Sequence, residues 1–486
     1  MFLRAGALSL ALLLASRLLG VVRESSLAAA FGSSGLADVA VLALSLPDWI
    51  ASVLASGALA YVLLPAWAGQ GAQQVAALQR RVARVLVVGG VVLALLLALL
   101  AAPVLRGLAA GVPAAMQPLA VQALWWSAAA VPPALLASLW ATRAQHERDF
   151  IGLYGANLVV NLVLIGAIAA AGLGGSSAAV PALGLGLLAA MGLRLLWLRA
   201  RLPAAGVPAA DVVAVPAAPL WLWAVLGAGL PLALPFVARS IASQAGEGAL
   251  ATFNYAWKLV ELPLVLAIQL VASLAFPAIA RALASGREEA AGAPVRQAFA
   301  LAWALACAAV AALAVGAPAL ARLLFGWGRM DAAALEQVWR WGLAGSWGLL
   351  PQALAAVALT VLASRKRMVP AVGAYGAALL LLLGAAASGV ADGQVLMQLL
   401  NAGYTVVAIV CLAAMGPEGL RWLPGRAMAW SAAGLAGVVI AARAGLPATW
   451  REDGLLAPLF AAAAAATLVL LFTLWRSPEL RQALRR

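Results

Sequence analysis

Long apolar stretches follow one another along the whole chain, separated by short polar segments. A helix needs about 20 apolar residues to cross a bilayer, and about 14 stretches approach or exceed that length. Their approximate ranges are 2–22, 34–64, 83–105, 117–142, 150–172, 178–200, 217–242, 249–280, 297–321, 334–363, 369–388, 394–415, 426–444 and 455–475. The pattern therefore predicts an all-α, polytopic membrane protein with about 14 transmembrane helices.

Composition excludes a water-soluble protein. Of the 486 residues, 65% are hydrophobic and 10% are charged, against about 45–50% and 25% in soluble domains. The start of the chain, Met1–Arg4 before an apolar run, has the form of a signal peptide. Arg17 and Arg23 interrupt the region where cleavage would occur, so we expect this segment to be kept.

The net charge of +14 follows the positive-inside rule and does not indicate nucleic-acid binding. If the N-terminus is cytoplasmic, most of the Lys and Arg residues fall in cytoplasmic segments, such as Arg80-Arg81 and Arg365-Lys366-Arg367. Such a bias sets the orientation of membrane proteins. We therefore expect both termini in the cytoplasm and the protein in a bacterial inner membrane.

A weak internal repeat predicts two lobes. Leu64-Pro65-Ala66 and Phe276-Pro277-Ala278 each close a long span, the second and the eighth, and a basic segment follows each. Both halves would begin on the same side, as in a parallel repeat about an axis along the membrane normal. The predicted domains are an N-terminal lobe of six helices (1–201), a cytoplasmic linker (202–216), a C-terminal lobe of six helices (217–415), and two further helices with a basic tail (416–486).

The first group of charges inside a span lies in Ser16–Glu24. A charge near the centre of a membrane helix costs about 2.5–3.5 kcal/mol, so such residues usually face an aqueous cavity or a partner. Arg17 and Glu24 share a helical face, about 10 Å apart along the axis. Gly20 between them permits a bend or a close helix approach. In the second span, Asp38 and Asp48 follow, and Pro47 predicts a kink.

The second group lies in the eighth span. Lys258 and Glu261 are three residues apart and predict a contact on one helical face, and Pro263 predicts a bend just after them. We interpret the two groups as a cavity whose cations bind an anionic substrate, with the acids as partners in the empty state or as coupling groups. The alternative is that both groups are ion pairs of purely structural value.

Few residues are suited to catalysis or metal binding. Cys307 and Cys411 lie in apolar stretches without metal-ligand spacing, and His146 is the single histidine. We expect no catalytic residues, no metal site and no cofactor. Most of the 18 Trp residues are expected at the membrane interfaces.

A family resemblance rests on several motifs in order along the chain. They are Ser16-Arg17-x-x-Gly20-x-x-Arg23-Glu24, Ala30-Phe31-Gly32, Asp38, Leu46-Pro47, Gly57-Ala58, Tyr255–Pro263, Leu324-Phe325-Gly326 and the stretch from Ser364-Arg365 to Pro370. With these motifs the sequence resembles the MurJ/MviN lipid II flippases of the multidrug/oligosaccharidyl-lipid/polysaccharide exporter superfamily. The family has fourteen helices, in two six-helix lobes plus two more.

The resemblance implies export of an undecaprenyl-pyrophosphate-linked sugar to the periplasmic leaflet by alternating access. It assigns pyrophosphate binding to Arg17, Arg23 and Lys258, with Glu24, Asp38 and Glu261 as acidic partners. It also implies that the last two spans receive the polyprenyl tail. Beyond this glycan and membrane lipid, no partner is expected and a monomer suffices. Membrane potential, protons or sodium could each supply the energy.

The chain departs from the family pattern in three places. Ala51-Ser52 stands where the family commonly has two arginines, Ala55-Ser56-Gly57-Ala58 lacks an acid, and the cation of the eighth span is Lys258 where Arg is usual. A flippase for another lipid-linked oligosaccharide, such as an exopolysaccharide repeat unit, is therefore an alternative.

Two other function classes are weighed against a flippase. A drug/cation antiporter of the same superfamily predicts twelve spans and an acidic cavity. A membrane glycosyl polymerase or ligase needs acidic or histidine catalysts in a large outside loop, and no predicted outside loop is large enough.

Overall fold

The computed structural model describes residues 2–53, 57–202, 216–284, 288–445 and 454–484. Within these ranges all regular structure is helical, and no strand occurs. Leu, Ala, Val and Gly dominate the helices. In hydrocarbon even Val and Gly are held helical, because a spanning segment must satisfy its backbone polar groups internally. The predicted all-α fold class is confirmed.

The predicted spans correspond to helices one by one. Twelve described helices are long and apolar enough to cross a membrane, or thirteen when the bent pair Ala332–Ser346 and Leu349–Ser364 counts as one span. The remaining predicted span, 2–22, lies in α1 (Phe2–Phe31), a helix of 30 residues. The predicted span 34–64 contains α2 (Gly35–Val53) and the start of α3 (Leu59–Trp67), and residues 54–56 between them lie outside the described ranges.

The chain divides into two compact units. Unit 1 comprises Met1–Ala233, Ser243–Ala251 and Gly328–Met330, and unit 2 comprises Leu234–Ala242, Thr252–Trp327 and Asp331–Arg486. The division falls inside α9 (Ala218–Ala242). The predicted linker, 202–216, falls almost entirely on residues 203–215, outside the described part of the chain, and the predicted domain boundaries stay a prediction.

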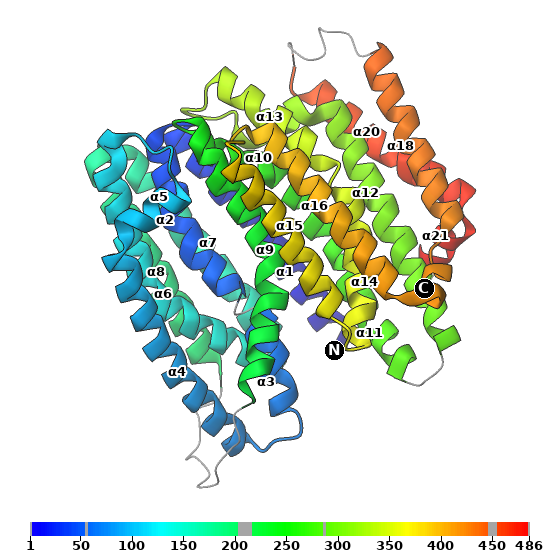
Figure 1. The fold of residues 1–486 in the computed structure, drawn as a ribbon, viewed down its shortest axis with the longest axis horizontal. Helices are drawn as coiled ribbons and strands as arrows, with labels where there is room; N and C mark the ends of the chain where they lie inside the picture. Colours follow the sequence, from blue (N-terminus) through cyan, green and yellow to red (C-terminus); the bar gives the residue numbers. More distant parts are fainter. Residues whose placement is uncertain (1, 54–56, 203–215, 285–287, 446–453, 485–486) are drawn as a thin grey trace. The chain divides into compact units, whose positions relative to one another are not determined.

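Unit 1 is built around α6 (Figure 1). Helix α6 packs against α2, α4 and α8, while α7 packs against α1 and α8. The helices added here are α4 (Ala72–Leu99), α5 (Ala101–Leu108), α6 (Gln117–His146), α7 (Phe150–Leu173) and α8 (Gly175–Arg201), with a short turn, η2 (Ala114–Met116).

Two serines of α6 fix the position of α2. Ser127 Oγ donates to the carbonyl of Ala43 at 2.7 Å, and Ser138 Oγ donates to that of Ala51 at 3.4 Å. Both serines are fully buried. Small residues of this kind let membrane helices approach closely and bond across the interface. The contact holds the segment of α2 that carries Asp48.

Unit 2 is built around α12 (Glu288–Phe325), which packs against α11, α13, α14, α18 and α20 (Figure 1). Helix α16 packs against α13, α14 and α15. Between α9 and α10 lies a short turn of unit 1, η3 (Ser243–Ala245). The other helices of the second half of the chain are α10 (Ala249–Pro263), η4 (Leu264–Ile268), α11 (Gln269–Ala284), α13 (Ala332–Ser346), α14 (Leu349–Ser364), α15 (Val369–Ala387), α16 (Gly393–Ala414), α17 (Gly416–Arg421), α18 (Gly425–Gly445), α20 (Leu456–Arg476) and α21 (Pro478–Leu484).

Two segments from later in the chain complete one end of unit 1. Arg329 N donates to the carbonyl of Ala29 at 3.0 Å, and Gly35 N donates to Glu247 Oε1 at 2.9 Å. Gly328 and Gly248 have positive φ angles of 62° and 79°. A Cβ at Gly328 would overlap the carbonyl oxygen of Ala29 in the last turn of α1, and one at Gly248 would overlap that of Ser33 in the turn after α1. Glycine is therefore required at both points of contact.

Asp149 joins the start of α7 to the end of α8. Its carboxylate accepts from Gly152 N at 2.9 Å and from Arg201 Nε and Nη2 at 2.8 and 3.0 Å. The hydrogen bonds from Arg201, and then that from Gly152, lower the pKa of this carboxyl below its ordinary value. The stabilisation is present above the ordinary carboxyl pKa of about 3.9 and is lost as pH falls through the lowered pKa.

We predict that Asp149→Ala lowers the stability of unit 1 by about 1 kcal/mol at neutral pH, as loss of a helix cap typically does. Thermal melting of the purified protein would measure the effect, and the difference from the parent should shrink as pH falls below the ordinary carboxyl pKa of about 3.9. Arg199→Ala, which removes an exposed cation of the same helix, is the matched control and should leave the melting temperature unchanged. An equal effect of both substitutions would contradict the assigned role.

Candidate functional site

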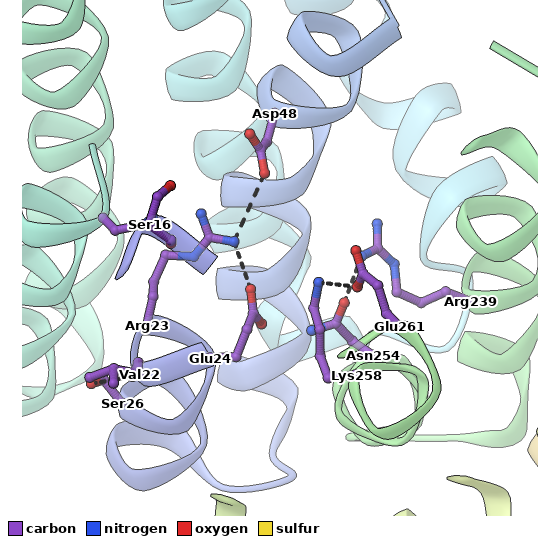
Figure 2. Close-up of polar contacts among 11 residues, drawn as sticks. Ser16, Val22, Arg23, Glu24, Ser26, Asp48, Arg239, Asn254, Lys258 and Glu261 are labelled. Atoms are coloured by element: carbon purple, nitrogen blue, oxygen red, sulfur yellow. Dashed lines mark hydrogen bonds and ion pairs between the residues drawn. The ribbon is translucent and has the colours of Figure 1, made fainter. Parts of the chain in front are cut away.

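Arg23 is the central cation of the site in unit 1. Its guanidinium lies 2.7 Å from Glu24 Oε1 and 3.9 Å from Asp48 Oδ2 on α2 (Figure 2). The Arg23 side chain is 14% exposed, whereas that of Asp48 is 49% exposed. A distance of 3.9 Å is an ion pair but exceeds hydrogen-bond length. Arg23 is therefore firmly held by one acid and loosely by a second that faces open space.

Arg17 does not form the predicted pair with Glu24. Its side chain is exposed, and no ion pair of Arg17 occurs among the residues that the structure describes. Seven residues of helix separate the two by about 10 Å, and Arg23, the neighbour of Glu24, occupies that carboxylate instead. Ser16, next to Arg17, is fixed differently, because its carbonyl accepts from Asn161 Nδ2 of α7 at 3.2 Å.

Asp38 is buried and serves as a helix cap. Its two carboxylate oxygens accept from Gly248 N and Ala251 N, each at 2.8 Å, at the start of α10. In return, Glu247 accepts from Gly35 N at the start of α2. Asp38 in the first turn of α2 thus caps the start of α10, and Glu247 just before α10 caps the start of α2. A carboxylate is stabilised there by the unpaired amides and the positive dipole end of the helix.

Arg194 of α8 is a buried cation near Asp48. The residue is nine-tenths buried, and its enclosed Nε makes no hydrogen bond within the described part of the chain. Asp48 is the carboxylate that acts on it electrostatically. Arg194 therefore lies inside the helix packing of unit 1.

The site in unit 2 is a row of polar side chains on α10. Lys258 Nζ lies 2.6 Å from Glu261 Oε2, so the predicted contact of these two residues is confirmed (Figure 2). One turn earlier, Asn254 accepts at 3.0 Å from Nη1 of Arg239 on α9. The Arg239 guanidinium also lies over the ring of Phe236, 4.9 Å from its centre. Unit 2 therefore presents two cations and one acid within two turns of α10.

The predicted bends differ in outcome. Helix α10 ends at Pro263, and a π-helical turn, η4, follows over Leu264–Ile268 before α11 begins. Proline removes a backbone donor and disturbs the α-helical ladder, and π turns of this kind interrupt long helices. Helices α1 and α2 continue through Gly20 and Pro47, and the bends expected there stay a prediction.

Three residues of the two sites were missed or set aside at the level of sequence. Arg239 stands near the end of its span, where an arginine is unremarkable, and Arg194 stands near two further arginines of a cytoplasmic end. Asn254 carries no charge. Of the three, only Asn254 had a signal in the sequence: Asn254, Lys258 and Glu261 fall at i, i+4 and i+7 and so share one helix face.

No metal centre is formed by the described residues: no group of three or more His, Cys, Asp or Glu side chains there could hold an ion. The chemistry on offer is electrostatic. Guanidinium and ammonium groups held beside carboxylates at membrane depth can exchange those partners for a bound anion.

The family model for the lipid II flippase MurJ matches residues 27–415 of the chain. No curated protein matches the sequence. Among solved structures, one of the lipid II flippase MurJ in an inward closed conformation is similar with a TM-score of 0.80 and 13% identity, covering 99% of this chain and 100% of that chain.

Transporters of the wider superfamily share the fold less closely. An inward-facing multidrug resistance MATE family transporter of the MOP superfamily has a TM-score of 0.64 and 16% identity, over 83% of this chain and 94% of that one. A MOP superfamily transporter from Pyrococcus furiosus, described by a reverse polarity of its binding pocket, has a TM-score of 0.60 and 14% identity, over 85% and 94%. These likenesses establish the fold.

We predict that Asp38→Ala destabilises unit 1, because it removes the acceptor of two amide hydrogen bonds, each worth about 1.5–3 kcal/mol to a charged group. Thermal melting in detergent is the measurement. Glu247→Gln is the matched variant: its remaining oxygen can still accept from Gly35 N, so its loss should be much smaller. If Asp38→Ala melted with the parent, the capping role would be wrong.

We predict the opposite behaviour for Arg194→Met. Burying a cation whose Nε lacks a partner is costly, and Asp48 keeps both its solvent exposure and Arg23 after the change. The variant should melt at the parental temperature or above it. A large drop in melting temperature would show instead that Arg194 stabilises the helix packing of unit 1.

Proposed function

The chain belongs to the lipid II flippase MurJ family, and on that premise we propose that it exports a polyprenyl-diphosphate-linked glycan of the lipid II type. The direction is from the cytoplasmic to the periplasmic leaflet of a bacterial inner membrane, with both termini in the cytoplasm. The family is a transporter family, and no catalytic step is part of the proposal. Arg17, Arg23 and Lys258 are the proposed diphosphate-binding residues.

The observation that carries the proposal is the position of Arg23 inside a span, between two carboxylates at unequal distances. It holds Glu24 at 2.7 Å but Asp48 only at 3.9 Å. A phosphate oxygen can replace the looser carboxylate and gain a charge-assisted bond from the planar fork of the guanidinium. Inserting an arginine near the centre of a span costs about 2.5–3.5 kcal/mol, and such residues usually serve a function. Binding an anionic substrate is a function that needs this cation.

Lys258 supports the same reading in unit 2. Its ammonium and the Glu261 carboxylate are both partly exposed, at 24% and 34%, so water or a ligand reaches the pair. Arg239 adds a second cation beside it through Asn254. A diphosphate carries more than one negative charge and is suited to two such positive groups.

In the proposed mechanism the acids hold the cations in place while no substrate is bound. The diphosphate displaces them, and alternating access then exposes it to the other leaflet, with the π-helical turn after Pro263 as a point of bending. No cofactor takes part; membrane potential, protons or sodium supply the energy. Glu24 and Glu261 are the better coupling acids, since backbone amides already occupy both oxygens of Asp38.

The polyprenyl tail is proposed to lie against α18 and α20, which follow the two six-helix lobes of the prediction. These helices pack against α12 and against each other. They also expose large apolar side chains, among them Ile440, Phe460 and Leu468. A monomer suffices for this arrangement.

A second candidate substrate is another lipid-linked oligosaccharide, such as an exopolysaccharide repeat unit. It is favoured by Ala51-Ser52, where the resemblance leads one to expect two arginines. Ala51 is buried beside α6, with its carbonyl bonded to Ser138. The position therefore has no cation to offer, and a substrate with fewer negative charges would fit.

Complementation of a MurJ-depleted bacterium, with a leaflet assay for lipid II in the same cells, tests the proposal. We predict that the parent restores export and that Arg23→Ala and Lys258→Ala each reduce it at least about tenfold, the equivalent of about 1.4 kcal/mol. Arg367→Ala, at an exposed cation of the turn between α14 and α15, is the control and should export normally.

Three outcomes are informative. Export by both Arg23→Ala and Lys258→Ala at parental protein levels would overturn the assignment of the diphosphate site. Failure of the parent with the protein present in the membrane would exclude lipid II and favour the second substrate. Retention of activity by Arg23→Lys would show that charge alone, and not the guanidinium fork, is needed.

A further inference from the structure

A cavity of about 700 Å³ lies within unit 2, between α13 and the first turns of α16. This volume falls inside the range of about 300–1,000 Å³ that is typical of small-molecule sites. Its polar and aromatic lining consists of Trp339, Arg340, Trp347, Gln394, Gln398 and Asn401. None of these residues belongs to the two charged groups described above.

Trp347 stands at the junction of α13 and α14. It follows the last residue of α13, where the two helices meet at a bend of 47°. Its side chain is 41% exposed and lines the cavity. The indole is therefore accessible to a molecule bound there.

Three amides line the facing side of α16. Gln394, Gln398 and Asn401 fall at i, i+4 and i+7 and so share one helix face. Asn401 Nδ2 donates to the carbonyl of Ala344 at 2.8 Å, which ties α16 to α13. Gln394 and Gln398 are exposed. Both amides are therefore accessible from the cavity that they line.

The charge of the cavity is nearly balanced. Arg340 pairs with Glu336 at 2.5 Å, one turn earlier on α13, and lies over the ring of Trp339 at 5.7 Å. The remaining polar groups are amides, which offer both donors and acceptors. A diphosphate would gain little here. An uncharged ring with hydroxyl groups at its edge and C–H bonds on its faces would satisfy the amides and the indoles together.

We propose that this cavity binds a pyranose ring of the glycan carried by the substrate, with Trp347 against a face of the sugar and Gln394 and Gln398 bonded to its hydroxyl groups. The inference rests on the proposed function, because a lipid-linked glycan supplies the sugar. It assigns recognition of the glycan to α13 and α16, separately from recognition of the diphosphate by Arg23 and Lys258.

Binding is tested on the purified full chain in nanodiscs, by saturation-transfer NMR with the soluble disaccharide of N-acetylglucosamine as the probe. The parent should bind it. Trp347→Ala and Gln398→Leu should each weaken binding at least tenfold, whereas Trp347→Phe should keep most of it. Trp327→Ala is the matched control: Trp327 is an exposed tryptophan of unit 2 outside the cavity and should bind as the parent does.

The result separates the two proposals. Failure of the parent to bind the disaccharide, or equal binding by the parent, Trp347→Ala and Gln398→Leu, would overturn the sugar site, even with lipid II export restored. Displacement of the disaccharide by inorganic pyrophosphate at this cavity would overturn it too. Disaccharide binding that depends on Trp347, together with failed lipid II export, would keep the sugar site and reject lipid II as the substrate.

Discussion

A charge inside a bilayer must have a partner or a use, because hydrocarbon offers no water to stabilise it. The described sites follow from this constraint. Arg23 is held by Glu24 and more loosely by Asp48, and Lys258 is held by Glu261. A carboxylate 3.9 Å away is more easily displaced by a ligand than one at hydrogen-bond distance. Pairing with acids therefore reconciles burial of these cations with recognition of an anion.

Helix α10 and the cavity between α13 and α16 differ in the same respect, the charge of their side chains. Helix α10 concentrates charge, with Lys258 and Glu261 close to Arg239. The cavity concentrates neutral donors, acceptors and indole surface, and its one arginine is already balanced by Glu336. A substrate with a charged linkage at one end and an uncharged sugar at the other presents the same two kinds of chemistry. Unit 2 thus offers each part of such a molecule a matching surface.

Hydropathy alone predicted the spans, because the demand for apolar length acts on every helix independently of its neighbours. The contact of Lys258 with Glu261 was predictable for a similar reason, since three residues of helix fix it. The surroundings of Arg194 and Asp38 were not predictable in this way, because they depend on helices or helix ends far away in sequence. The partner of Arg239, Asn254, lies on the next helix, so spacing within one helix did not reveal it either. From the sequence, Asp38 was interpreted as an acidic partner in the substrate cavity. In the structure it bonds two backbone amides that lie some 210 residues later in the chain.

The segments 243–251 and 328–330 that complete unit 1 also set an order of assembly. A ribosome that has delivered the first 233 residues to the membrane has produced the greater part of unit 1 but neither Glu247 nor Gly328. Until then the start of α2 lacks one of its acceptors and Asp38 lacks both of its amide donors. The first half must therefore wait, partly formed, for the second half to be synthesised. A gene split after residue 233 would yield a first fragment whose unit 1 is completed only by segments of the second fragment.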